Sequence, residues 1–222
     1  MDGRKRKALR WAYQALVRTF GGQGWWPAET PFEVVVGAVL TQNTAWKNVE
    51  RAIDNLKEAG VLTPQGLRSL DETRLAALIR PVGYYNIKAK RLKNTMGFLD
   101  QEYGGDLVMM FSDSLARLRD KILTVNGIGP ETADSILLYA GEKQIFVVDA
   151  YTRRVLSRHG MLTDGATYED IQQLFMKNLP RKVSLYKEYH ALLVHVAKTF
   201  CKTTPACTGC PLEGPWPASS GK

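Results

Sequence analysis

Two groups of residues in this sequence have types and spacings that suit chemistry. The first is Val125–Ala133, VNGIGPETA, in which Gly127 and Gly129 stand one residue apart between two helical stretches. Glycines at this spacing let the backbone turn tightly and bring its amides close to a ligand, and a helix that begins there presents N–H groups to an anion. This hairpin suits a phosphate of any nucleic-acid sequence. An ordinary helix–helix turn is the alternative.

The second group is formed by the three cysteines of the chain, Cys201, Cys207 and Cys210, spaced C-x5-C-x2-C. Three clustered thiols do not make a disulfide framework and point to a metal. A structural zinc or a 4Fe–4S cluster takes four ligands as a rule, so a cluster here needs one more, such as Glu213, a histidine or solvent. The alternative is a metal-free loop held by its prolines and by packing.

Helices must position these groups, because the hydrophobic periodicity is helical almost throughout. Thr30 predicts a helix N-cap, with Pro31 at the first position and Glu33 closing a capping box. Apolar residues then fall on one face of that helix and of the next two that the pattern predicts. They are Phe32, Val35, Val36, Val39 and Leu40, then Val49, Ala52, Ile53 and Leu56, then Leu115, Leu118 and Ile122.

Later helices are predicted from Gly129-Pro130 to Gly141, from Asp149 to Gly160, and from Thr167 until just before Pro180. A stripe of apolar residues between 189 and 200 predicts the last long helix. The short apolar run Gln144–Val148 has no partner strand in the sequence, which argues against a sheet. The expected fold class is therefore all-α.

The composition suits a protein that binds a polyanion. The 222 residues are 45% hydrophobic, enough for one or two cores, and 30 basic against 22 acidic side chains give a net charge of +8. Such an excess favours nucleic acid, although a solvated basic surface is the alternative. The longest apolar runs, such as Val34–Leu40, are too short to span a bilayer, and the basic N-terminus lacks the apolar core of a secretory signal. A monomeric cytoplasmic protein is expected.

Five motifs resemble, in the same order, those of the endonuclease III superfamily of helix-hairpin-helix DNA glycosylases, and together they cover most of the chain. The hairpin resembles its helix-hairpin-helix, and the cysteines resemble its iron–sulfur loop. The other three are Leu40–Thr44 (LTQNT), similar to its DNA-probing turn; Gly83–Lys90 (GYYNIKAK), similar to its G-x-Y-N-x-K-A motif; and Val147–Ala150 (VVDA), similar to the segment with its catalytic aspartate.

The resemblance implies two helical lobes with double-stranded DNA across the cleft between them. Residues 30–143 would form a helical barrel lobe that carries the hairpin. Residues 1–29 and 144–222 would form the second lobe, with Asp149 near the junction and a Cys-rich tail. The phosphate-binding hairpin residues would be Asn126, Gly127, Ile128, Gly129, Glu131 and Thr132. Further candidates for phosphate contacts are Lys88, Lys90, Arg91, Lys93, Arg153 and Arg154.

By the same resemblance Asp149 is the catalytic residue. A carboxylate beside the anomeric carbon stabilises the positive charge that forms as the base departs, or orients the attacking water; Asp149 also suits a helix N-cap. Bifunctional members carry a lysine where this chain has Glu131, and Glu131 cannot form an imine. Water is then the expected nucleophile, and the enzyme is expected to lack AP lyase activity.

A base inside a duplex must be flipped out for this chemistry, and the gap that it leaves must be filled. The resemblance assigns the gap to Gln42, whose amide can pair with the orphaned partner base, and the opening of the opposite strand to Tyr84. A local hydrogen-bonding role at a helix terminus is the alternative for Gln42.

Four residues are expected to form a base pocket: Trp25, Trp26, Pro27 and Trp46. Aromatic faces attract cations, and an N-alkylated purine is cationic. The WWP sequence, with an aromatic residue just after LTQNT, most resembles the 3-methyladenine DNA glycosylase branch. The expected activity is thus base excision repair of alkylation damage by a monofunctional glycosylase. The alternative for the tryptophans is that they fasten the N-terminal helix to the core.

Two departures from that branch leave rivals open. Ala150 stands where its members have lysine, and mismatch uracil/thymine glycosylases of the superfamily have alanine there. Trp216 stands at the place of the fourth cysteine, so the tail either holds a cluster with an unusual ligand or is a remnant loop. The rival functions are a mismatch or oxidised-pyrimidine glycosylase and a non-catalytic DNA-binding module.

Overall fold

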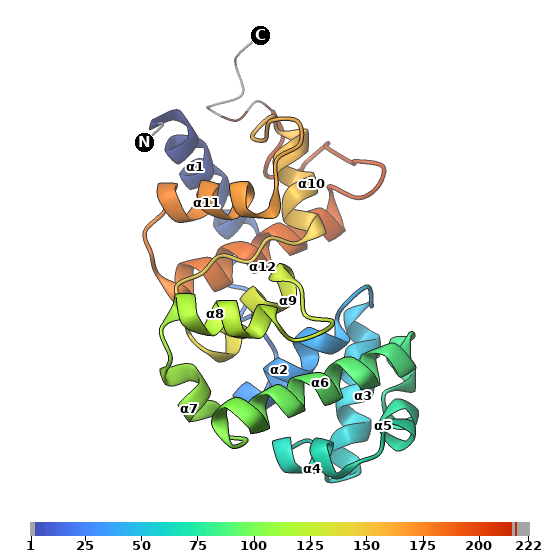
Figure 1. Cartoon of the computed structure of the whole chain (residues 1–222). Coiled ribbons are helices and arrows are strands. Elements are labelled where there is room, and N and C mark those ends of the chain that lie inside the picture. Colours follow the sequence, from blue (N-terminus) through green and yellow to red (C-terminus); the bar gives the residue numbers. More distant parts are fainter. Residues whose placement is uncertain (1–2, 215, 217–222) are drawn as a thin grey trace. The chain divides into compact units, whose positions relative to one another are not determined.

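The computed structural model describes residues 3–214 and 216. All regular secondary structure in this part of the chain is helical (Figure 1), which confirms the all-α fold class. The chain divides into two compact units at residues 25/26 and 143/144, whereas the sequence placed the first boundary at 29/30. We call Trp26–Lys143 the hairpin unit, and the described residues before and after it the terminal unit.

The hairpin unit is built around the long helix α6, which packs against α2, α4, α5 and α7 (Figure 1). Its helices are α2 (Pro31–Leu40), α3 (Trp46–Glu58), α4 (Pro64–Ser69), α5 (Glu72–Leu78), η1 (Arg80–Val82), α6 (Tyr85–Tyr103), α7 (Leu107–Ser112), α8 (Leu115–Leu123), α9 (Pro130–Ser135) and the π-helical turn η2 (Ile136–Ala140).

Helix α2 is the core of the hairpin unit. Every residue from Phe32 to Leu40 is buried, so the expectation of one apolar face was too narrow. Thr30 caps the helix as predicted, its hydroxyl accepting from the amide of Glu33 at 3.1 Å. The predicted capping box is wrong, because the Glu33 carboxylate accepts from the amide of Glu29 at 3.2 Å and pairs with the Lys57 ammonium at 3.1 Å.

The terminal unit has four helices: α1 (Gly3–Phe20), α10 (Ala150–Arg158), α11 (Tyr168–Asn178) and α12 (Val183–Thr199). Helix α12 packs against α1 and α10, and α1 packs against α11 (Figure 1). The buried Tyr189 hydroxyl of α12 donates to the carbonyl of Leu9 in α1 at 2.9 Å. The predicted helix starts at Asp149 and Thr167 are confirmed, the second with a complete capping box.

The apolar run Ile145–Val148 is buried without being part of a helix. A buried backbone must find hydrogen-bond partners, and here side chains of α11 supply them. Gln172 donates to the Phe146 carbonyl at 2.7 Å, and the Tyr168 hydroxyl accepts from the Val148 amide at 3.3 Å. The Phe146 ring stacks on Phe175 with 3.8 Å between centroids. This rigid segment leads directly into Asp149.

None of the helices in the described part of the chain combines the length and apolarity that crossing a bilayer would require.

Candidate active site

Asp149 is the N-cap of α10, and both of its carboxylate oxygens have neighbours. One accepts from the Thr152 amide at 2.7 Å, and the other lies 3.4 Å from the Nε2 atom of His190 in α12. The Asp149 side chain is 12% exposed, so it is enclosed but still open to a reactant. The structure thus holds this carboxylate in one orientation from two helices.

The electrostatic surroundings keep Asp149 ionised. Burial by itself raises the pKa of this carboxyl, but the charge of His190 and the hydrogen bonds from His190 and Thr152 lower it more, and the net pKa is below the ordinary value. At neutral pH the group is therefore an anion. It can stabilise a developing cation or accept a proton from water, but it cannot act as a general acid.

His190 is a site residue that the sequence did not reveal. It lies within the apolar stripe of α12 and is buried at 6% exposure. Its contact with Asp149 joins α12 to α10. The spacing of residues within one helix does not reveal which residue of another helix they contact.

The hairpin has the backbone geometry that its glycines suggested. Gly127 has φ 93°, in the left-handed region, and Gly129 caps α9 with Pro130 at the first position. Helix α9 is anchored by Asp134, whose fully buried carboxylate accepts from the Arg119 guanidinium of α8 at 2.7 and 3.1 Å. Buried, bidentate pairing of this kind fixes the two helices on either side of the turn.

Gln42 lies against this hairpin, although 85 residues separate it from Gly127. Its side-chain nitrogen donates to the Gly127 carbonyl at 3.1 Å and to the Thr132 hydroxyl at 2.9 Å. Its side-chain oxygen accepts from the Arg91 guanidinium of α6. The structure therefore brings the expected DNA-probing residue and the expected phosphate-binding turn together in one unit.

Tyr84 projects from the turn before α6. Its side chain is 74% exposed, and its backbone has φ 46°, a conformation that is uncommon outside glycine. The ring of Tyr84 is therefore open to solvent on a turn whose backbone conformation is strained.

Several basic residues that the sequence offered as phosphate contacts have structural roles instead. Lys88 is buried at 1% exposure. The Lys93 ammonium donates to the carbonyls at the end of α4, at 2.6 Å to Arg68 and 2.7 Å to Leu70. The Arg154 guanidinium donates to the carbonyl of Cys201 at 2.7 Å. Arg153 also reaches a carbonyl, that of Ala166 at 2.6 Å, whereas the side chain of Lys90 is exposed.

Of the four expected base-pocket residues, three line one hollow in the hairpin unit. Trp26, Pro27 and Trp46 border a space of about 370 Å³, and the two indole rings meet edge-on with 5.2 Å between centroids. Gly37 of α2 allows this arrangement, because a Cβ there would lie 3.3 Å from the Trp26 ring.

Trp25 does not join that hollow. It lines a separate space of about 230 Å³ in the terminal unit, with Gln23, His195 and Lys198. The expectation of a single slot built from all three tryptophans is therefore not met within the hairpin unit. Adjacent residues of an extended chain point in different directions, which is why the WWP sequence alone could not decide this.

The hollow at Trp26 is acidic, which the sequence did not predict. Its lining carries four carboxylates, from Glu29, Glu33, Glu50 and Asp54, against the one ammonium of Lys57. Lys57 pairs with Glu29 at 3.0 Å and Glu33 at 3.1 Å, and Glu50 accepts from the Trp46 indole nitrogen at 2.7 Å. The sequence did contain one indication of this contact: Trp46 and Glu50 are four residues apart, so they lie on the same face of a helix.

The model of the HhH-GPD superfamily of base excision DNA repair proteins matches residues 36–181. This chain belongs to that superfamily. It is therefore a DNA glycosylase of the endonuclease III type that acts in base excision repair and binds DNA.

Two relatives in sequence and one solved structure show how similar this chain is to known members. A protein of Methanocaldococcus jannaschii, provisionally named a DNA repair glycosylase, is 52% identical over 90% of this chain and 92% of its own length. Endonuclease III of Sulfolobus acidocaldarius is 31% identical over 81% and 78%. The structure of H. pylori 3-methyladenine DNA glycosylase bound to 1,N6-ethenoadenine has a TM-score of 0.75 at 28% identity, covering 87% of this chain and 97% of that one.

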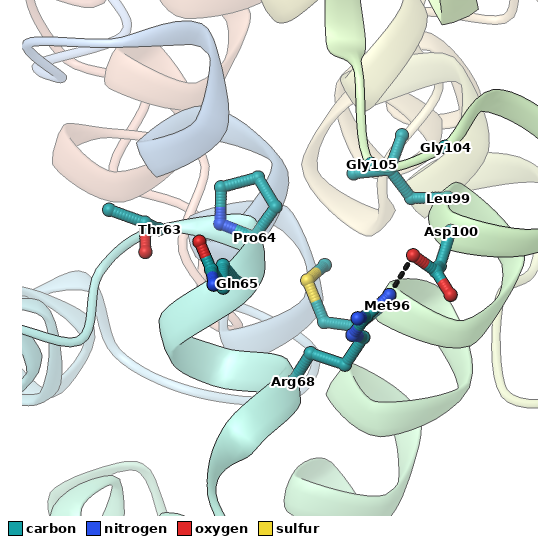
Figure 2. A pocket seen from close by; sticks show the side chains of 9 residues that line it. All are labelled: Thr63, Pro64, Gln65, Arg68, Met96, Leu99, Asp100, Gly104 and Gly105. Atoms are coloured by element: carbon teal, nitrogen blue, oxygen red, sulfur yellow. Dashed lines mark hydrogen bonds and ion pairs between the residues drawn. The ribbon is translucent and has the colours of Figure 1, made fainter.

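This HhH-GPD glycosylase has a larger hollow away from its motifs. Figure 2 shows this space of about 490 Å³, between the start of α4 and the end of α6. Arg68 and Asp100 face one another there as an ion pair. None of the residues that the five motifs single out lines it. Size alone therefore does not locate the functional site in this protein.

The cysteine tail carries three thiols, one fewer than the four ligands that a 4Fe–4S cluster takes as a rule. In the described part of the chain, no three His, Cys, Asp or Glu side chains gather as a metal site. Cys201 is buried, with its sulfur accepting from Arg158 at 3.2 Å, while Cys207 is exposed. Trp216, at the place of the fourth thiolate, is buried and stacks on His159 with 4.7 Å between centroids.

Proposed function

We propose that this glycosylase is monofunctional and removes alkylated purines, with 3-methyladenine as the type of its substrate. The observation that carries the proposal is the hollow at Trp26 and Trp46, where aromatic rings and an excess of carboxylates lie together. A purine alkylated on a ring nitrogen is a cation, and both aromatic faces and carboxylates favour a cation over a neutral base. The name of the H. pylori relative, a 3-methyladenine DNA glycosylase, is consistent with this substrate class.

The chemistry assigned to Asp149 follows from its ionised state. As the bond between the sugar carbon and the base nitrogen breaks, the electron pair leaves with the base, so an alkylated base departs neutral. The positive charge that remains on the sugar is stabilised by the Asp149 carboxylate. Water then adds to the sugar carbon and gives up a proton to this carboxylate.

The absence of a lyase step is proposed from Glu131. This residue lies exposed in the first turn of α9, at the position of the lysine in bifunctional members. A carboxylate cannot attack the sugar to form an imine. The amine of Lys88 does not offer a substitute, because it is buried and donates to the carbonyls of Leu40 and Val82 at 2.9 and 3.1 Å.

The primary experiment is chromatography of the bases that the purified protein releases from methylated duplex DNA, with strands inspected before and after alkali. Free 3-methyladenine or 7-methylguanine, with strand breaks only after alkali, is the expected result. Release from duplexes with uracil, mismatched thymine or oxidised pyrimidines, and none from methylated DNA, would show that the substrate class is wrong.

The role of the acidic hollow predicts a charge-dependent selectivity. Glu50→Gln is expected to slow release of cationic 7-methylguanine by up to about fivefold, because the attraction between a cation and an exposed carboxylate is worth up to about 1 kcal/mol. Release of a neutral base such as 1,N6-ethenoadenine should change little. Single-turnover rates on the two duplexes measure this ratio.

Glu58→Gln is the matched control, since Glu58 is an exposed carboxylate of the same helix that does not line the hollow. An equal loss on both substrates in Glu50→Gln, or the same shift in Glu58→Gln, would contradict the role of the hollow in recognising charge.

We further propose that protein contacts hold the cysteine tail in place. The Arg158 guanidinium donates to the carbonyls of Lys202 and Thr203 at 2.5 and 2.7 Å, and Trp216 packs on Trp11 with 6.2 Å between centroids. The protein purified without oxygen should then contain no stoichiometric iron and show no visible absorbance band. Stoichiometric iron, with base release lost on chelation, would overturn this proposal.

A further inference from the structure

Lys88 occupies an unusual place for a lysine. Its side chain is among the largest fully buried ones in the described part of the chain, and burial lowers its pKa to about 8, with a smaller contribution from the charge of Arg91. Burying an ammonium is costly unless it is hydrogen-bonded. The Lys88 ammonium donates to the Leu40 carbonyl at 2.9 Å, to the Val82 carbonyl at 3.1 Å and to the Thr44 hydroxyl.

These three acceptors come from two different turns. Leu40 and Thr44 flank Gln42 on either side, while Val82 precedes Gly83 and Tyr84. The Thr44 hydroxyl closes the same arrangement by donating to the Val82 carbonyl at 2.7 Å. One buried ammonium therefore ties together the backbone of both turns that carry the proposed DNA-probing side chains.

Arg91, one turn later on α6, holds the Gln42 side chain itself. A guanidinium has only donors, so the atom of the Gln42 amide that faces Arg91 must be the oxygen. The nitrogen is then directed to the Gly127 carbonyl and the Thr132 hydroxyl. Gly127 is required for this, because a Cβ there would collide with the side chain of Arg91.

We propose that Lys88 and Arg91 are positioning residues for DNA probing, Lys88 fixing the two turns that carry Gln42 and Tyr84 and Arg91 fixing the donor and acceptor edges of the Gln42 amide. The proposal rests on the DNA-probing role that the family resemblance implies for Gln42. It assigns two basic residues of α6 to the geometry of base flipping rather than to phosphate contact. Flipping needs a wedge held in one pose, since a loose wedge loses part of its interaction energy to ordering.

The test uses a duplex that needs no base cleavage: a tetrahydrofuran abasic analogue with fluorescent 2-aminopurine opposite it. Insertion of Gln42 into the gap changes the fluorescence of the opposite base, and Gln42→Ala should abolish that change. Lys88→Met and Thr44→Val are expected to reduce the change severalfold and, in a separate assay on methylated duplex, to slow base release roughly tenfold or more, as misplaced groups do. Thr44→Ser keeps the hydroxyl and should restore both to near the wild-type values.

Lys90→Met is the matched control for charge, because Lys90 is the exposed lysine of the same helix. It should weaken binding to undamaged and abasic duplex equally and lower the salt dependence of binding, as loss of a phosphate contact does. In Lys88→Met the loss should instead be confined to the probing signal and the release rate. Arg91→Met should weaken the signal in the same selective way.

Three results would overturn the proposal. The first is a wild-type probing signal in a folded Lys88→Met or Thr44→Val protein. The second is an equal, salt-dependent loss on every duplex in Lys88→Met and Lys90→Met. The third is a fluorescence change that Gln42→Ala leaves unaltered, because Gln42 would then not be the residue that fills the gap. Because the abasic duplex carries no base to excise, a wrong substrate class leaves the probing signal and the binding measurements intact.

Discussion

Asp149→Asn protein is expected to release base roughly 10²–10⁴-fold more slowly than the wild type, with unchanged affinity for damaged duplex. The reason is that asparagine keeps the shape of the side chain and removes its negative charge. The structure shows that this charge is maintained by the contacts with His190 and Thr152. Single-turnover base release and a binding titration on an abasic-analogue duplex measure the two quantities separately.

Asparagine is also the right control for the second role of Asp149. Asn and Asp serve equally well as N-caps, so α10 should keep its cap and the melting temperature should change little. Asp149→Ala loses both the charge and the cap, and should cost about 1 kcal/mol of stability in addition. Equal turnover in wild type and Asp149→Asn would mean that this carboxylate stabilises α10 and takes no part in catalysis.

The lowered pKa of Asp149 predicts the acid limb of the pH profile. The wild-type rate should persist as the pH falls through the ordinary range of an aspartate and decline only below it, because the ionised form is the active one. The same sign holds for stability: the contribution of this carboxylate is present above its unfolded pKa and is lost as the pH falls through its folded pKa. His190→Gln keeps Asp149 buried but removes the contact that lowers its pKa, so the acid limb should move to higher pH.

Local chemistry predicted the starts of helices in this protein, but not the partners of its polar side chains. Thr30, Asp149 and Thr167 each cap the predicted helix, because a cap depends on residues within one turn. The capping box at Glu33 failed because Lys57, from the next helix, competes for its carboxylate. A side chain whose role depends on a distant segment carries no sign of it in the spacing of its neighbours.

The basic residues show the same limit for function. Counting charges suggested phosphate contacts at Lys88, Lys93 and Arg154, yet each donates to carbonyls of its own unit. A long basic side chain can bind either a carbonyl of its own protein or a phosphate of a ligand. The choice depends on which carbonyls the fold leaves within its reach. The motifs, in contrast, predicted one unit for Gln42 and the hairpin, and in the structure the Gln42 side chain donates to the Gly127 carbonyl.

Replacing one side chain at the hairpin should convert the outcome of the reaction. Wild-type protein incubated with borohydride and damaged duplex is expected to give no covalent complex, whereas Glu131→Lys should give one and break strands without alkali. The lysine amine would attack the sugar carbon as the base leaves, and the ring-opened imine is what borohydride reduces and traps. Glu131 is exposed, so the change should be tolerated by the fold.

Glu58→Lys makes the same change of charge at another exposed position of the hairpin unit and should give no trapped complex. Trapping of the wild type would show that another lysine reaches the sugar and that Glu131 does not define the activity. Continued base release without trapping in Glu131→Lys would place this position out of reach of the sugar. Trapping in Glu131→Lys alone would mean that this one side chain decides whether the enzyme stops at base removal, since α9 and its buried anchor at Asp134 are the same in both proteins.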